Sequence, residues 1–249
     1  MNVLTVENVS KQYRLHRERR LFGERLRGES DESETFWALR DVSFAIKHGE
    51  SFGVVGHNGA GKSSLLSVIA GTVHPSEGRV IRVGRVGGLL ELGSGFHPDL
   101  TGLENIRLNA SLLGMSRAEL EQKLDAIIEF SELEQFINEP LRTYSSGMMG
   151  RLGFAVAVHY EPEVMLLDEV LAVGDAHFQQ KCADEMKRLA ESHVTFIFVS
   201  HNLAAVSNLC ERSIRLDHGR LVDEGPTIDV VERYQASLLE PAQAKLFSQ

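Results

Sequence analysis

The sequence is poor in cysteine and in long apolar runs. Its 249 residues include two cysteines, Cys182 and Cys210, and neither has the spacing of a metal ligand. A disulfide-built fold is therefore excluded, and we expect both thiols to be reduced and packed in a core, as suits a reducing cytosol. No apolar run approaches the roughly 20 residues that span a bilayer, and residues 1–7 lack a signal-peptide pattern. We expect a soluble chain that needs another protein to act across a membrane.

Basic residues are also scarce. The chain has 26 Lys and Arg against 35 Asp and Glu, which gives a formal net charge of −9. A nucleic-acid binder usually carries a basic excess that neutralises phosphates, so this balance argues against a nucleic-acid partner. The length fits one large domain, or one domain with a small appendage, and an apolar content of 43% is enough for a core.

Glycines gather in one stretch that fits the phosphate-loop pattern G-x-x-x-x-G-K-[ST]. The stretch follows an apolar run at 51–55, a predicted buried strand, and precedes a predicted helix at 65–70. Glycines let the backbone curl so that N–H groups point inward, and the helix adds the positive end of its dipole. The alternative is a glycine-rich turn with a chance Lys-Ser, and the flanking strand and helix argue against it. The residues of this predicted phosphate-binding loop are Gly56, His57, Asn58, Gly59, Ala60, Gly61, Lys62, Ser63 and Ser64.

Three side chains of this loop are given separate roles. Lys62 is expected to reach the β- and γ-phosphates of a nucleotide, and the Ser63 hydroxyl can ligate Mg²⁺. His57 is expected to face solvent and to take no part in catalysis.

Polar residues follow two further apolar runs. The run at 164–167 ends in Asp168 and Glu169, the pattern of a buried parallel strand with carboxylates at its carboxyl end. Asp168 suits a Mg²⁺ ligand, and Glu169 would orient the attacking water beside the γ-phosphate. The alternative for Glu169 is an extra surface acid at a strand end. The run at 194–199 leads to His201, for which we favour a functional role over a structural one.

The rest of the chain is predicted as strands and helices with one polar insertion. Strands are expected at 4–9 and 42–46, and the Arg- and Glu-rich segment at 14–34 lies between them. This segment is either a solvated, mobile insertion or a docking element for a partner. A hairpin is expected at 214–222, and a closing helix at 228–239.

A helical block is expected from Thr101 to about residue 138. Thr101 and Glu104 have the spacing of a capping box, and Ser116 with Glu119 repeats it. Further along, a helix is expected to begin at Met149, and Asp175 is placed to cap another helix.

Taken in order, these motifs resemble the ATP-binding cassette of ABC transporters, from about Leu4 to Tyr234. Residues 56–63 match the Walker A motif, 144–148 the signature motif and 165–169 the Walker B motif with its catalytic glutamate. Residues 173–175 resemble the D-loop, His201 the switch histidine, and Tyr13 the aromatic residue that stacks on adenine.

The resemblance implies an α/β fold, namely a P-loop NTPase cassette. It would have a RecA-like parallel-sheet core, an antiparallel β subdomain and an inserted helical subdomain at about 101–160. The cassette would span 1–240 with a variable insertion at 14–35, and 241–249 would be a short tail without a carbohydrate-binding domain.

The resemblance also implies a site shared by two chains. Two cassettes would form a head-to-tail homodimer, with each ATP between Walker A of one chain and the signature of the other. The signature residues are Ser145, Ser146, Gly147 and Met148, and Asp175 belongs to the D-loop. Catalysis is assigned to Glu169, His201 and Lys62, and Mg²⁺ to Ser63 and Asp168, with Glu91 a further candidate ligand.

Departures from the family pattern indicate which branch of the ABC transporter family the sequence resembles. Ser146 replaces the first glycine of the usual signature motif, and Met148 replaces the polar residue at its end. The glutamine that the family usually carries in the loop after the first β subdomain is absent, and Glu91 is the nearest polar residue. These departures resemble the polysaccharide-export branch, which moves O-antigen, teichoic-acid and capsule-type glycans through a separate permease.

That branch implies an ATPase that powers export of a lipid-linked polysaccharide. It would lie at the cytoplasmic face of a bacterial inner membrane, bound to two permease copies that dock near 92–98. The alternatives are a cassette that exports another substrate, a soluble ABC ATPase of DNA repair or translation, and a non-hydrolysing nucleotide switch. The acidic single cassette argues against the second, and the presence of Lys62 and Glu169 argues against the third.

Overall fold

A computed structural model describes residues 1–15, 34–88, 95–167, 174–200 and 202–246. Four of the predicted site residues, Glu91, Asp168, Glu169 and His201, lie outside these ranges, as does most of the 14–34 segment.

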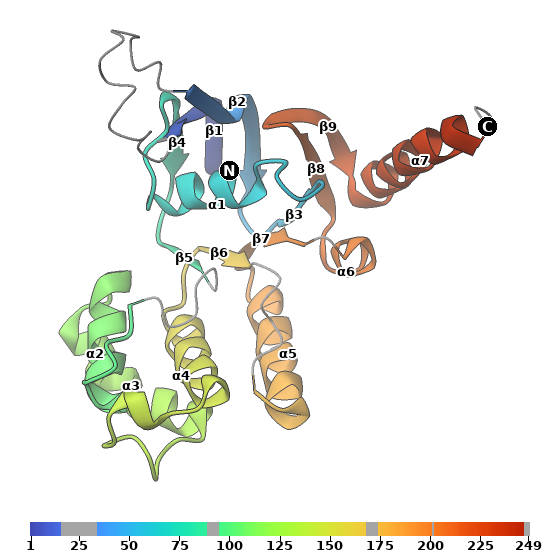
Figure 1. The fold of residues 1–249 in the computed structure, drawn as a ribbon. Coiled ribbons are helices and arrows are strands. Elements are labelled where there is room, and N and C mark those ends of the chain that lie inside the picture. Colours follow the sequence, from blue (N-terminus) through green and yellow to red (C-terminus); the bar gives the residue numbers. More distant parts are fainter. Residues whose placement is uncertain (16–33, 89–94, 168–173, 201, 247–249) are drawn as a thin grey trace, which may run out of the picture.

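The centre of the molecule is a six-stranded sheet in the order β5-β6-β7-β3-β8-β9 (Figure 1). Its first five strands run parallel, and β9 pairs antiparallel with β8 as the predicted hairpin. All the residues of β6 and β7 are buried, as expected for strands covered on both faces. The strands are β3 (Ser51–Val55), β5 (Val86–Gly88), β6 (Val164–Leu167), β7 (Thr195–Val199), β8 (Arg212–Asp217) and β9 (Arg220–Pro226).

A second, antiparallel sheet packs beside this one in the order β2-β1-β4. Its strands are β1 (Asn2–Leu15), β2 (Glu34–Lys47) and β4 (Glu77–Arg82). Leu4, Leu39 and Ile46 of this sheet share one buried cluster with Phe52 of β3 and Leu65 of the helix after it. This cluster joins the two sheets through the helix that follows the phosphate loop.

A helical lobe lies on the other side of the parallel sheet from the antiparallel sheet (Figure 1). It consists of α2 (Gly102–Leu113), α3 (Arg117–Ser131) and α4 (Ser146–His159), with a short 3₁₀ turn at Leu141–Thr143. The lobe has its own core, which includes Ile106, Ile127 and Leu152. The parallel-sheet core, the antiparallel sheet and the helices confirm the predicted α/β fold.

The remaining helices are α1 (Lys62–Ala70), α5 (Ala176–Glu191), α6 (Leu203–Leu209) and α7 (Thr227–Leu246). The predicted end of the closing helix near residue 239 is wrong, because α7 continues to Leu246. Among the described residues, no helix is both long and apolar enough to cross a membrane.

The predicted caps are confirmed, with one shift of a helix start. Thr101 and Glu104 form a complete capping box, and the Ser116 side chain accepts a hydrogen bond from the Glu119 amide. The helix expected from Met149 begins at Ser146 instead, because Ser145 occupies the N-cap position. Both cysteines are buried and free, as expected, and burial raises the pKa of each thiol to about 12.

Candidate nucleotide site

The phosphate loop connects β3 to α1 and depends on glycine at two crowded positions. Gly56 has a φ of 152°, and a Cβ atom there would collide with the carbonyl oxygen of Leu216. Gly61 is the N-cap of α1 at a φ of 105°, and a Cβ atom there would lie 2.5 Å from the Ala38 carbonyl oxygen. The loop can therefore pass against β2 and β8 only because these residues lack side chains.

The side chain of Lys62, near the end of the phosphate loop, reaches back to the residues at the start of the loop. Its ammonium group donates hydrogen bonds to the carbonyl oxygens of Gly56, at 2.6 Å, and of His57, at 3.0 Å. Lys62 is also the first residue of α1, so the ammonium lies close to the start of that helix. Both the ammonium and the α1 N-terminus favour an anion at this position.

A cavity of about 400 Å³ opens at this loop. Ser200, which follows β7 and is buried, lines it from the sheet side. None of the signature residues lines it. Among the described residues, those around the cavity are Phe36, Ala38, Asn58, Gly59, Gly61, Lys62, Ser63, Ser64, Val199 and Ser200.

Phe36 is a cavity residue that sequence reasoning did not single out. It is 51% exposed, which is unusual for phenylalanine, and it stands directly opposite Tyr13 in the β1–β2 ladder. Tyr13, the predicted adenine-stacking residue, is 37% exposed and lies 5.2 Å from the Lys11 ammonium. Directly opposed residues share one face of an antiparallel sheet, so both aromatic side chains project from the same face, and Phe36 is the one that lines the cavity. The sequence feature that could have identified Phe36 is the presence of an aromatic residue at the start of a strand.

The strands that carry the predicted catalytic residues end beside the loop. Leu167 ends β6 and Val199 ends β7, and β7 lies between β6 and β3 in the sheet. Asp168, Glu169 and His201 follow these ends in the sequence but lie outside the described residues, as does Glu91, so their roles stay predictions.

The predicted signature forms the start of α4. Ser145 caps the helix by accepting a hydrogen bond from the Met148 amide at 3.2 Å, and both Ser145 and Ser146 are exposed. Tyr144 anchors this start to the helical lobe, because its buried ring donates a hydrogen bond from its hydroxyl to the Phe136 carbonyl oxygen. The N-terminus of α4 is therefore exposed, and Tyr144 holds it in place on the helical lobe.

Gly147 has free space around it among the residues that the structure describes. Of these, a Cβ atom there would meet Ser145 Oγ at 3.8 Å and Gly174 Cα at 3.9 Å, which are ordinary contact distances. Its φ lies outside the left-handed range that requires glycine. Neither the backbone conformation nor the packing of the described residues therefore accounts for glycine at this position.

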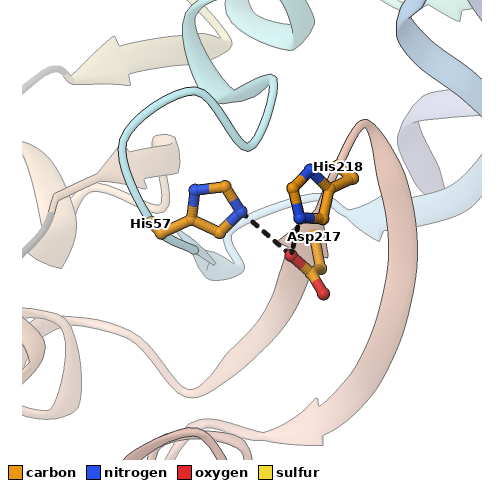
Figure 2. A group of neighbouring side chains, drawn as sticks. All are labelled: His57, Asp217 and His218. Carbon is orange, nitrogen blue, oxygen red and sulfur yellow. Dashed lines mark hydrogen bonds and ion pairs between the residues drawn. The ribbon is translucent and has the colours of Figure 1, made fainter. Parts of the chain in front are cut away.

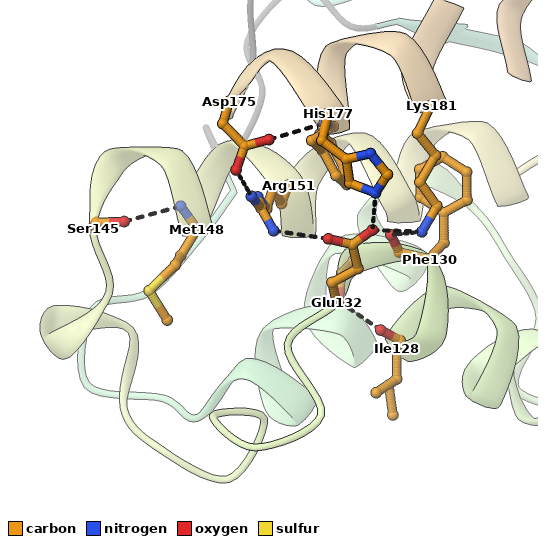
Figure 3. A network of polar contacts seen from close by, with 11 residues as sticks. Ile128, Phe130, Glu132, Ser145, Met148, Arg151, Asp175, His177 and Lys181 are labelled. Carbon is orange, nitrogen blue, oxygen red and sulfur yellow. Dashed lines mark hydrogen bonds and ion pairs between the residues drawn. The ribbon is translucent and has the colours of Figure 1, made fainter. Parts of the chain in front are cut away.

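Arg151 ties the signature helix to α5 and α3 (Figure 3). Its guanidinium group donates to Asp175 at 2.5 Å and to Glu132 at 3.0 Å. Asp175 caps α5, as predicted, by accepting from the Phe178 amide at 3.0 Å. That bond, together with the nearby Arg151 charge, lowers the pKa of the Asp175 carboxyl. Sequence reasoning missed Arg151. The available signal was a charged residue near the start of an otherwise apolar helix.

Two sequence-based expectations need correction here. His57 does not simply face solvent, because its side chain is 38% exposed and its Nε2 atom lies 2.9 Å from Asp217 Oδ1. Phe96, an apolar residue of the predicted docking segment 92–98 that was expected to be exposed for a partner, is half-buried and packs against the core of the helical lobe. The packing partners come from α2–α4, which the local sequence around Phe96 does not reveal.

Comparisons with known proteins agree with this geometry. A family model described as "ABC transporter" matches residues 39–172. The O-antigen export system ATP-binding protein RfbB of Klebsiella pneumoniae is 42% identical over 95% of this chain and 98% of its own length. The teichoic acids export ATP-binding protein TagH of Listeria monocytogenes is 39% identical over 93% of this chain and 69% of its own.

A solved structure of an ATP-binding cassette is also similar. It is a dimer in a post-hydrolysis state bound to ADP and Pi, with a TM-score of 0.70 and 25% identity. The match covers 90% of this chain and 98% of the other.

Proposed function

Because this chain belongs to the ABC transporter family and is an ATPase, we propose that it powers export of a lipid-linked polysaccharide through a separate membrane permease. The observation that carries the proposal is similarity along nearly the whole chain to two export proteins. These two proteins are named for the export of O-antigen and of teichoic acids, and each matches more than nine tenths of this chain. Export of a different substrate is the alternative.

We assign the phosphates of ATP to the loop between β3 and α1. Lys62 exchanges its bonds to loop carbonyl oxygens for bonds to the β- and γ-phosphates, and loop N–H groups complete the cradle. Tyr13 and Phe36 offer the adenine ring an aromatic surface beside the cavity.

The cavity also fits a hydrated Mg²⁺ ion. Ser63 lines the cavity next to Lys62 and supplies a hydroxyl oxygen, the kind of ligand that Mg²⁺ takes. Asp168 would add a carboxylate, and Glu91 is a further candidate. When bound, Mg²⁺ supplies charge neutralisation at the phosphates. Glu169 polarises the attacking water, and His201 stabilises the γ-phosphate.

The signature acts on the nucleotide of a second copy of this chain. The space that the described residues leave at Gly147 and the absence of signature residues from the cavity support this arrangement. So does the dimeric state of the similar cassette. The α4 N-terminus then points its positive end at the γ-phosphate held by the partner.

The cassette, which we place at 1–240, would act as a peripheral subunit at the cytoplasmic face of a bacterial inner membrane. Two copies would bind two permease subunits, and contact near 92–98 stays a prediction. The polysaccharide would meet the permease rather than this chain.

The test is complementation of a strain that lacks this chain. The wild-type chain should restore the surface polysaccharide, and Lys62→Ala should not. Lys187→Ala, which changes an exposed lysine on α5, is the matched control and should behave as wild type. ATP hydrolysis by each purified protein is measured in parallel. Normal surface polysaccharide in the deletion strain, with an active purified ATPase, would overturn the substrate assignment and leave the ATPase intact.

A further inference from the structure

Three side chains outside the nucleotide cavity converge on one point (Figure 2). His57 comes from the phosphate loop, Asp217 from the end of β8, and His218 from the turn between β8 and β9. One ligand atom from each lies within 4.8 Å of the other two. Nε2 of His57 is 2.9 Å from Asp217 Oδ1, and Nε2 of His218 is 3.8 Å from the same oxygen.

Each ring nitrogen of His57 faces an acceptor oxygen. Its Nδ1 lies 2.7 Å from the Asn58 carbonyl oxygen and its Nε2 lies 2.9 Å from the Asp217 carboxylate, so both neighbours are acceptors. A neutral imidazole has one N–H group and can satisfy only one of them. If Nδ1–H donates to the carbonyl, the Nε2 lone pair faces a carboxylate oxygen. Either a proton on Nε2 or a metal ion bound by both atoms removes this repulsion.

We propose that His57, Asp217 and His218 form a binding site for a divalent transition-metal ion of the Zn²⁺ type. Ligand atoms around a tetrahedral zinc with bonds of about 2.0–2.1 Å lie about 3.3–3.4 Å apart. The observed 2.9 and 3.8 Å separations bracket this value. Imidazole nitrogen with carboxylate oxygen suits zinc and its neighbours, whereas Mg²⁺ prefers oxygen alone. The bond from Nδ1 to a carbonyl oxygen is the usual way a metal-bound histidine is oriented.

The backbone holds the loop and the turn together at this place. The Gly219 amide donates to the Ala60 carbonyl oxygen at 2.9 Å, and the Arg40 amide donates to the Gly219 carbonyl oxygen at 2.8 Å. His218 takes a left-handed φ of 44° between Asp217 and Gly219. The ligand positions are therefore set by the fold. The ion would lie on the outer side of the loop and leave the nucleotide cavity open.

The test is cobalt and zinc binding by the purified full chain without nucleotide. Co²⁺ reports a tetrahedral site by its visible absorption, and a calorimetric Zn²⁺ titration gives the stoichiometry, expected to be one ion per chain. His218→Asn should weaken binding at least tenfold, and asparagine tolerates the left-handed φ. His193→Asn is the matched control, because His193 is also exposed and left-handed, at a φ of 63°, and it should bind as wild type.

Two further measurements distinguish the proposed site from other places on the protein where a metal ion could bind. An excess of Mg²⁺ should not displace the ion, since Mg²⁺ favours oxygen ligands. Zn²⁺ should raise the midpoint of thermal unfolding of the wild type and of His193→Asn, but much less that of His218→Asn. Equal binding by wild type and His218→Asn, or no saturable binding by the wild type, would overturn the proposal.

Discussion

At the scale of single residues, the glycines of the two nucleotide motifs differ in what requires them. Gly61 is needed by its own chain, because both its φ and the Ala38 carbonyl oxygen exclude a side chain. Gly59 has a φ of 84°, and no described residue lies within 4 Å of a Cβ atom built there, so its backbone conformation is what favours glycine. Gly147 is required neither by its φ nor by the described residues around it, and we infer a requirement from outside the chain.

Gly61→Ala should destabilise the protein more than Gly59→Ala. The second substitution costs about 1–2 kcal/mol for a left-handed alanine, and the first adds about 1–3 kcal/mol of overpacking against Ala38. Urea unfolding of the two purified variants measures the difference. Equal free energies of unfolding would contradict the steric reading of this contact.

Gly147→Ala should leave folding intact and impair catalysis. The unfolding midpoint should stay within about 2 °C of wild type, because an added methyl group meets the described residues at ordinary contact distances. ATP hydrolysis should fall at least tenfold if a partner's nucleotide approaches this backbone. ATP affinity of the isolated chain, measured at a concentration where it is monomeric, should not change. Unchanged turnover would show that nothing outside the chain approaches this position closely.

At the scale of elements, Arg151 couples the end of α3, the start of α4 and the cap of α5. Its side chain is 19% exposed, so water screens these pairs less than it screens pairs at the surface. Lys181 of α5 adds a second bond to the same Glu132 carboxylate at 3.0 Å. The signature helix is therefore fixed to α5 by charge as well as by packing.

Arg151→Met should lower the midpoint of thermal unfolding by several degrees and slow ATP turnover. Methionine keeps much of the apolar stem but removes both ion pairs. Arg188→Met is the matched control, since Arg188 pairs with Glu185 within α5 and is 60% exposed, and it should have little effect. If the two variants lose equal stability, the network does not couple the helices.

Sequence reasoning was most successful within single elements. The phosphate loop, the caps at Thr101 and Asp175, and the β8–β9 hairpin each depend on residues a few positions apart. The features that it missed, including Phe36 at the cavity and the contact of His57 with Asp217, depend on distant segments. His57 and Asp217 are 160 positions apart, and no local pattern encodes such a contact.

At the scale of the whole molecule, the phosphate loop and the signature occupy different bodies of one chain. The loop lies at the sheets, and the signature opens a helix of the separate lobe (Figure 1). Because the cavity at the loop includes no signature residue, a dimer would contain two sites, each with parts from both copies.

Mixing two inactive variants should therefore restore activity. A dimer of Lys62→Ala with Ser145→Arg contains one site in which both motifs are wild type. Each variant alone should be inactive, and the mixture should regain up to about a quarter of wild-type turnover, since half of randomly paired dimers are mixed. Dimer formation is checked by differential tagging. Complete inactivity of proven mixed dimers would mean that the site is not shared, or that both sites must work.

Because Gly219 supports the phosphate loop, the loop can reach its final shape only after the β8–β9 turn has been synthesised. The loop leaves the ribosome early, but its support from the β8–β9 turn is encoded about 160 residues later. At roughly 5–20 residues per second, that interval is roughly 10–30 s. A nascent chain would thus carry its complete glycine motif for many seconds before the loop could hold its final shape. Nucleotide capture is then a late event in the life of each new chain, which delays ATP use until the fold is nearly finished.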